Sequence, residues 1–377
     1  MPIELADDEL HAWLVLLRAP ALGAAALREL IGRHGSAAAA LAACRHDPAT
    51  PEPARAWLAA PDAARLAGDR AWLAAGEHRL VVWTSADYPS LLRDSQNPPA
   101  ALFVAGDPAL LWAPQLAIVG ARGASAAGLA NARAFAKALV EAGLVVTSGL
   151  AEGIDGAAHA AALDAGGRTV AVLGTGPDLV YPRRHEALAA RIAATGALVS
   201  EFPPGTPGKP EHFPRRNRII AGLSLGTLVV EASLQSGSLI TARLANETGR
   251  EVFAIPGSIH NPLARGCHRL IRDGAKLVET AQEVLEELRG LGGALAAGLR
   301  ERIAASEDAP VSAPSARTDD PDYARLLAAL DDEPRALDVL VARTGLPAAA
   351  VSSMLLVLEL DGVVSAAHGR YARRPAR

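Results

Sequence analysis

The residues best suited to chemistry stand in one short run that joins an aromatic ring to three arginines. The run reads Phe213-Pro214-Arg215-Arg216-Asn217-Arg218 and leads into an apolar stretch with helical spacing, 219–223. Arginines at the start of a helix lie at its positive end, so an anion or a carboxylate is needed opposite them. A ring beside guanidinium groups suits single-stranded nucleic acid, because bases stack on the ring while guanidiniums hold phosphates. The alternative is a surface cluster that Glu201 or Glu211 neutralises.

Two glycine-containing loops precede predicted helices and offer backbone N–H groups to an anion. They are residues 120–125, which contain Arg122 and Ser125, and residues 236–241, which begin Ser236-Gly237-Ser238. Unpaired N–H groups in the first turn of a helix bind anions. The first loop has neither the spacing of a dinucleotide GxGxxG motif nor the GK[ST] of a P-loop. The two loops together could follow a phosphodiester backbone or, alternatively, hold one nucleotide.

Asp155 and His159 stand one helical turn apart, a spacing that suits a metal ion or acid–base chemistry. No third ligand stands nearby in the sequence, so a capping aspartate with a buried histidine is the favoured interpretation. The run 174–176, Gly-Thr-Gly, is a weak nucleotide signature, although it leads to the basic residues Arg183 and Arg184. The sequence therefore predicts no catalytic residue, no metal and no cofactor.

The composition argues against several classes of protein. The chain has 377 residues and a net charge of −4, so a polyanion site must be a local concentration of positive charge. Its two cysteines, Cys44 and Cys267, do not form a CxxC spacing, which argues against structural zinc and a disulfide framework. We find neither an apolar run of about 18 residues nor a basic targeting segment. We therefore expect a cytoplasmic protein of two or three domains, without a membrane partner.

Short β-branched runs alternate with helical segments between about residues 80 and 280. The runs are 116–119, 144–147, 169–173, 197–199, 227–230 and 251–255. Continuous apolar strands followed by glycine, serine or proline are typical of a parallel sheet covered by helices on both faces. Ligands bind such sheets at the carboxyl ends of the strands. The predicted fold class is α/β, with an extended Rossmann-like sheet that is parallel or mixed.

Smaller modules are predicted at both ends of the chain. Residues 1–75 read as a small helical module of the SAM-like or helix-hairpin-helix kind, with Ala21 where such a hairpin usually has its first glycine. This departure favours packing over DNA contact. The sheet domain is expected over 80–288, a flexible linker over 289–321, and a winged helix over 322–377.

The third helix expected in the winged helix, residues 347–360, contains no lysine or arginine. A helix that enters the major groove normally carries such residues. The apolar composition therefore favours protein binding or packing, whereas the basic tail after residue 370 argues for DNA contact.

Together these motifs resemble the DNA-processing protein A (DprA/Smf) family. The resemblance rests on the ordered runs Tyr88-Pro89, 97–103, 148–155, Tyr181-Pro182, 200–203, 213–222, 229–232, 236–243 and 252–257. It implies a non-enzymatic protein that binds and protects single-stranded DNA and loads the RecA recombinase during natural transformation. It also implies a homodimer formed through the sheet domain.

Carried over motif by motif, the resemblance assigns DNA contacts to individual residues. Arg122 would contact phosphate, Phe213 would stack on a base, and the amide of Gly149 would help to bind phosphate. The full predicted set is Arg122, Ser125, Gly149, Arg183, Lys209, Phe213, Arg216, Asn217, Arg218, Ser236, Gly237 and Ser238. Gln235 is a departure, because many members of the family have a basic residue just before Ser-Gly-Ser.

The enzymatic alternative is a Rossmann-like nucleotide-processing hydrolase related to the cytokinin-activating phosphoribohydrolases. Those enzymes use a GGxGTxxE motif in which a glutamate assists glycosidic cleavage. The corresponding loop, 236–243, contains no glutamate, which favours the binding protein. A transcription factor that reads DNA through the winged helix is disfavoured by the apolar third helix.

Overall fold

The computed structural model describes most of the chain up to residue 288 and part of the chain after 320. The described residues are 5–45, 47–288, 321–330, 335–346, 351, 354, 355, 358, 364–367 and 370–373. The chain divides into two compact units, Met1–Ala297 and Gly298–Arg377. Apart from Pro321, the predicted linker lies outside the described residues. Within the described part, no helix has the length and apolarity needed to span a membrane.

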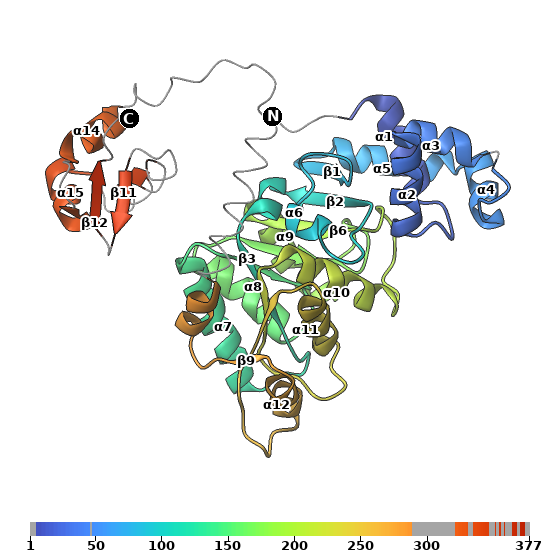
Figure 1. Cartoon of the computed structure of the whole chain (residues 1–377). Coiled ribbons are helices and arrows are strands. Elements are labelled where there is room, and N and C mark those ends of the chain that lie inside the picture. The colour runs from blue at the N-terminus through green and yellow to red at the C-terminus, as the bar shows by residue number, and fades with distance from the viewer. Residues whose placement is uncertain are drawn as a thin grey trace. The chain divides into compact units, whose positions relative to one another are not determined.

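The first unit is built on a nine-stranded sheet with the order β1-β2-β6-β5-β4-β3-β7-β8-β9 (Figure 1). The strands are β1 His78–Val82, β2 Ala101–Gly106, β3 Gln115–Val119, β4 Val145–Ser148, β5 Thr169–Val172, β6 Ala197–Ser200, β7 Gly226–Val229, β8 Glu251–Ala254 and β9 Lys276–Leu277. Along this order, every neighbouring pair from β6 through β5, β4, β3, β7 and β8 to β9 is parallel. The pairs β1–β2 and β2–β6 are antiparallel. The predicted mixed, Rossmann-like sheet is confirmed.

Helices cover both faces of the sheet, because alternate side chains of each buried strand point to opposite sides. Leu116 and Ile118 of β3 pack in one cluster with α7 (Ala126–Glu141) and α8 (Ile154–Asp164). Ala117 and Val119 pack in another with α10 (His212–Leu223) and α11 (Ser238–Glu247). The other helices of this part are α6 Ser90–Arg93, η1 Pro108–Trp112, η2 Arg183–His185, α9 Glu186–Thr195, η3 Pro262–Ala264, α12 Arg265–Arg272 and a helix over 281–288.

Strand β3 is a topological switch point. The chain leaves β3 through α7 to β4 on one side, and returns later through α10 to β7 on the other. The loops that follow β3 and β7 therefore diverge above the sheet edge and leave a crevice between them. This is the position at which the sequence places the loops 120–125 and 236–241.

The N-terminal helices share a hydrophobic core with the first two strands. They are α1 Asp7–Leu17, α2 Ala24–His34, α3 Ala37–Cys44, α4 Glu52–Ala59 and α5 Ala63–Ala74. Trp13 and Leu16 of α1 lie in one buried cluster with Val82 and Phe103 of the sheet. Ala21, in the turn between α1 and α2, has a left-handed φ of 62°, the conformation that a glycine adopts most easily. The division of this unit near residues 75–80 stays a prediction.

The second unit has the elements of a winged helix. Helices α14 (Pro321–Ala329) and α15 (Leu337–Thr344) stand beside a three-stranded sheet with the order β10-β12-β11. The strands are β10 Arg335–Ala336, β11 Val364–Ala367 and β12 Arg370–Arg373. Within the predicted third helix the described residues Val351, Met354, Leu355 and Leu358 are helical and buried. The winged-helix prediction is confirmed, and β10 is an addition to it.

Candidate nucleic-acid interface

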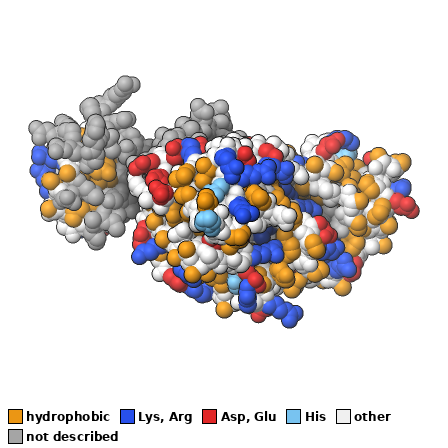
Figure 2. Space-filling model, turned by 90° about the horizontal axis from the view of Figure 1, so that it is seen from below, with side chains coloured by type: hydrophobic (Ala, Val, Ile, Leu, Met, Phe, Trp, Pro, Cys, Tyr) orange, Lys and Arg blue, Asp and Glu red, His pale blue; other side chains and the backbone are white. Residues whose placement is uncertain are grey.

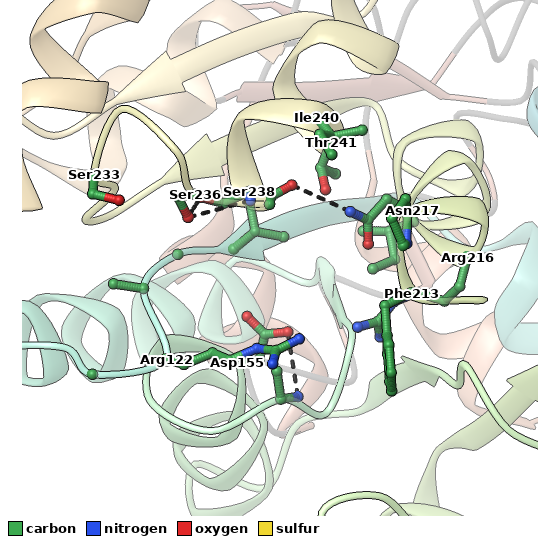
Figure 3. Close-up of a pocket in the computed structure, with 18 of the residues that line it drawn as sticks. Arg122, Asp155, Phe213, Arg216, Asn217, Ser233, Ser236, Ser238, Ile240 and Thr241 are labelled. Atoms are coloured by element: carbon green, nitrogen blue, oxygen red, sulfur yellow. Dashed lines mark hydrogen bonds between the residues drawn. The ribbon is translucent and has the colours of Figure 1, made fainter. Parts of the chain in front are cut away.

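A cleft of about 670 Å³ opens at the switch point, beyond the carboxyl ends of β3, β4 and β7. Its lining comes from the loop 120–123, the loop 233–238 and the first turns of α10 and α11. Figure 3 shows Ser236 and Ser238 on one wall, Arg122 and Asp155 on the other, and Phe213, Arg216 and Asn217 of α10 along a third side. A smaller pocket of about 90 Å³ is also lined by Arg122, Phe213 and Arg216.

Phe213 presents an aromatic surface to the cleft. A Cβ on Gly174 would lie 2.9 Å from Cδ1 of Phe213, so the absence of a side chain there leaves room for the ring. The guanidinium carbon of Arg122 lies 5.7 Å from the centre of the Phe213 ring, within the range of a cation–π interaction. The Tyr181 ring centre is 5.4 Å from that of Phe213, and Tyr181 is 55% exposed. Tyr181 was missed as a site residue, although the Tyr181-Pro182 motif pointed to it.

Arg216 places a buried positive charge against the cleft. Its Nη1 donates to the carbonyl oxygens of Gly149 and Val172, at the ends of β4 and β5. Burial lowers the pKa of Arg216 to about 10, an effect that the Asp155 carboxylate opposes, so the guanidinium stays charged at neutral pH. A Cβ on Gly149 would lie 1.9 Å from Arg216 Nη1, which explains why glycine stands there.

The amide of Gly149, which the sequence prediction assigned to phosphate, is bonded within the protein. It donates to Oδ2 of Asp155 at 3.1 Å, and the amide of Ala151 donates to the same oxygen at 3.4 Å. Burial raises the pKa of Asp155, although Arg216 and these amides act in the opposite direction. Asp155 therefore holds the loop after β4 in place. It is the second residue of α8, whose N-cap is Gly153, so the expected role as a helix cap is wrong.

The loop 236–238 forms the opposite wall and is tied to α10. The hydroxyls of Ser236 and Ser238 lie 2.6 Å apart, and Gly237 is the residue before the first turn of α11. Asn217 Nδ2 donates to the carbonyl oxygen of Gly237 at 3.2 Å. Because the N-terminus of α11 opens at the cleft, its partial positive charge adds to that of Arg122 and Arg216.

Arg215 and Arg218 point to a carboxylate instead of the cleft. Glu201, whose side chain is 2% exposed, pairs with Arg215 Nε at 3.0 Å and with Nη2 of Arg218. Arg218 also donates to the carbonyl oxygen of Asn97, and burial lowers its pKa. Neutralisation by Glu201, the alternative considered for the whole run, thus holds for two of its three arginines.

The structure brings most of the predicted residues together and leaves four aside. The cleft and the adjoining pocket are lined by Arg122, Gly149, Phe213, Arg216, Asn217, Ser236, Gly237 and Ser238. Arg183 and Lys209 are exposed away from this lining, and Lys209 lines a separate groove with Arg18 and Asp69. Ser125 caps α7 through Gly128 N, and Arg218 is paired as described.

His159 is a core residue. Its Nδ1 lies 2.7 Å from the hydroxyl of Thr169, and burial lowers its pKa to about 3. The imidazole is therefore neutral at neutral pH and bonds to Thr169, as expected for a buried histidine. Among the residues that the structure describes, no three His, Cys, Asp or Glu side chains form a group that could hold a metal.

Charges of both signs are distributed over the surface, with local gatherings of lysine and arginine (Figure 2).

A doubly wound sheet with a switch-point cleft of this chemistry defines a Rossmann-like binding protein for anionic, ring-bearing ligands. The family described as DNA recombination-mediator protein A matches residues 79–289, the DprA-like N-terminal HHH domain matches 7–46, and the DprA winged helix domain matches 310–370. The chain belongs to the DNA-processing protein A family, as the sequence motifs predicted.

Individual relatives cover most of the chain. Protein Smf of Escherichia coli is 46% identical over 303 residues, which are 80% of this chain and 79% of Smf. The X-ray structure of DprA from Streptococcus pneumoniae has a TM-score of 0.66 and 36% identity, and covers 76% of this chain and 99% of its own. A DNA processing protein A from Helicobacter pylori, whose structure is described by its single-stranded DNA binding mode, has a TM-score of 0.52 and 26% identity over 57% of this chain and 97% of its own.

Proposed function

We propose that this protein is a single-stranded DNA-binding recombination mediator that acts in the cytoplasm without catalysing a reaction. The observation that carries the proposal is the meeting of the Phe213 ring with the cations Arg122 and Arg216 and the N-terminus of α11 in one cleft. Rings that stack on bases and cations that hold phosphates bind single strands with little sequence preference. The Helicobacter relative, whose structure is described by its single-stranded DNA binding mode, supports the same ligand.

The proposal assigns different roles to the predicted residues. Arg122, Arg216 and the loop 236–238 bind phosphate, while Phe213 and Tyr181 offer faces to bases. Asn217 and Gly149 position these groups through the bonds described above. Arg183 and Lys209 are exposed cations that a longer strand reaches beyond the cleft. Arg218 and Ser125 keep structural roles.

Membership of the family supports the finer part of the proposal. We infer that the protein loads RecA onto incoming single strands during natural transformation, and that it acts as a homodimer formed through the sheet domain. An oligonucleotide shift with and without RecA tests the first inference, with a ternary complex as the expected result. Sedimentation of the purified chain tests the second.

The experiment that tests DNA binding is a fluorescence anisotropy titration of labelled poly-dT. We expect salt-sensitive, length-dependent binding, because each neutralised phosphate contributes about −0.7 to the slope of log K against log salt. Phe213→Ala should weaken binding by about 1–3 kcal/mol, since one base loses its stacking partner. The melting temperature serves as the control for folding. Poly-dT left unbound at low salt would exclude the function, and unchanged affinity in Phe213→Ala would exclude the stacking role.

The hydrolase alternative predicts release of a free base from a nucleoside monophosphate. The only carboxylate that lines the cleft, within the described residues, is Asp155, and it is buried and bonded to two amides. We expect no base release under conditions in which oligonucleotides bind.

A further inference from the structure

Glu231 holds a buried carboxylate at the N-terminus of α7. It lies two residues beyond the end of β7, and only 8% of its surface is exposed. Its Oε2 accepts the amide of Ser125 at 2.9 Å, and its Oε1 accepts the Ser125 hydroxyl at 2.6 Å. Asn261 Nδ2 donates to Oε1 at 3.3 Å. The carboxylate thus collects three donors at the positive end of a 16-residue helix.

This is the position at which doubly wound sheets usually receive a phosphate. Helix α7 is the first to follow the switch-point strand β3, and the first turn of such a helix offers its N–H groups to the phosphate of a nucleotide. Here the amide and hydroxyl of Ser125, the residue before the first turn of α7, are already bonded to the Glu231 carboxylate, and the Gly128 amide donates to the Ser125 hydroxyl. Ser125 and Glu231 are accordingly absent from the lining of the cleft, although Arg122 and Gly123 of the same loop belong to it.

The Glu231 carboxylate packs tightly against the start of α7. A Cβ on Gly128 would lie 2.4 Å from Cδ and from Oε2 of Glu231, so the carboxylate packs directly on the backbone of α7. The main chain of Glu231 holds the other end of the loop, because its carbonyl oxygen accepts the amide of Ala121 at 2.7 Å. Glu231 therefore fixes both ends of the segment that presents Arg122.

We propose that Glu231 is a specificity-determining residue that takes the place of a nucleotide phosphate at α7. The proposal rests on the proposed function and deepens it. With its own carboxylate at α7, the cleft excludes the phosphate of a free mononucleotide from that helix. The phosphates of a DNA strand are directed to Arg122 and to the wall formed by residues 236–238. The chain thus distinguishes a polymer, which reaches both walls, from a monomer.

The test removes the carboxylate and uses inorganic phosphate and dTMP as probes. In Glu231→Ala the Ser125 and Asn261 donors are left without an acceptor, so we expect the variant to bind phosphate at least about tenfold more tightly than the wild type. Its melting temperature should rise more with millimolar phosphate than that of the wild type, measured against chloride at the same ionic strength. If Glu231→Ala folds only in the presence of phosphate, that result supports the proposal equally.

A double variant provides the matched control. Adding Gly128→Ala to Glu231→Ala places a methyl group in the space that the carboxylate leaves, so the gain in phosphate binding should disappear. A gain that persists in the double variant, or no gain in Glu231→Ala, would overturn the proposal.

A measurement on the wild type keeps the proposal testable if the variants fail to fold. In amide NMR spectra we expect phosphate and dTMP to leave the Ser125 signal unmoved, and a shift of that signal would contradict the inference. Since none of these readouts uses an oligonucleotide, failure of DNA binding and failure of the Glu231 inference are separate outcomes.

Discussion

At the scale of single residues, nearby carboxylates determine whether each arginine of α10 points to the cleft or forms an ion pair with a buried glutamate. Arg216 lies against the cleft because its partners are two carbonyl oxygens and the nearby Asp155. Arg215 and Arg218, on either side of it, turn to the buried Glu201. Neighbours in sequence therefore divide between binding and folding, since successive residues of a helix point in different directions.

This division predicts opposite phenotypes for two alanine variants. Arg122→Ala should reduce affinity for oligo-dT and lower the salt slope by about 0.7, because an exposed cation at the cleft is lost. Its stability should stay within about 0.5 kcal/mol of the wild type. Arg218→Ala should lose about 3 kcal/mol of stability, because the buried Glu201 loses one of its partners. Anisotropy and urea unfolding separate the two, and the reverse assignment would refute the division.

The buried His159 predicts a pH dependence of stability. Its pKa is about 3 when folded and 6.5 in the reference state, so between these values the unfolded chain binds more protons than the folded one. Stability from this group is fully present above pH 6.5 and falls as the pH drops towards 3, by about 1.4 kcal/mol per pH unit. In His159→Gln this part of the acid sensitivity should vanish. Parallel curves of unfolding free energy against pH for the two proteins would contradict the prediction.

At the scale of elements, the loops after β3 and β4 pack backbone to backbone. Gly153 has a φ of 76°, and a Cβ there would lie 2.3 Å from the carbonyl oxygen of Ala121 and 2.4 Å from that of Arg122. The loop that carries Arg122 therefore rests on the start of α8. Only a glycine lets the two loops approach this closely.

Gly153→Ala should consequently lower stability by more than about 2 kcal/mol, since strain in φ adds to the steric clash. Gly123→Ala is the matched control in the neighbouring loop, because a Cβ there meets no other atom within 4 Å. Thermal melting of both variants tests the contact. Equal melting temperatures would show that the loops do not press on one another.

The sequence predicted the parallel core of the sheet well, because each of its central strands is a continuous apolar run. The runs 116–119 and 169–173, for example, correspond to β3 Gln115–Val119 and β5 Thr169–Val172. The antiparallel strand β1 was missed, since His78–Val82 begins with two polar residues and has only three apolar ones. What stabilises β1 is its pairing with β2 and the helical module beside it, which are contacts distant in sequence.

The sequence predicted which loops line the cleft, because those loops follow strands whose carboxyl ends meet at one edge of the sheet. Pairing partners were harder to predict, because Glu231 lies 106 residues from Ser125 and nothing local links them. The bond between the Gly149 amide and Asp155 was missed, and Asp155 was expected to cap α8, whose N-cap is Gly153.

At the scale of the whole molecule, the N-terminal helices α1 to α5 (the helical front) and the sheet fold as one body. Besides the shared core, Arg18 forms an ion pair with the buried Asp69 at 2.6 Å and donates to the carbonyl oxygen of Pro204 at 2.7 Å. Arg28 of α2 donates to the carbonyl oxygen of Pro98. These bonds connect the front to the loops on which α10 rests.

Removal of residues 1–75 should therefore expose Val82 and Phe103 and give an aggregated or much less stable protein. Removal of residues 298–377, the second compact unit, is the control and should leave the melting of the first unit unchanged. Size-exclusion chromatography and thermal melting check both. A monomeric protein of full stability without residues 1–75 would show that the front is dispensable.

The central place of β3 also determines when a newly made chain can first capture DNA. One wall of the cleft follows β3 and β4, whereas Phe213 and the loop 236–238 are synthesised much later. Domains begin to fold while they are still on the ribosome, yet β3 lacks its second neighbour until β7 (Gly226–Val229) has emerged. A nascent or prematurely terminated chain shorter than this lacks β7, β8 and β9 and the second wall of the cleft. The cleft therefore needs a chain that extends past the loop 236–238 before it can close around DNA.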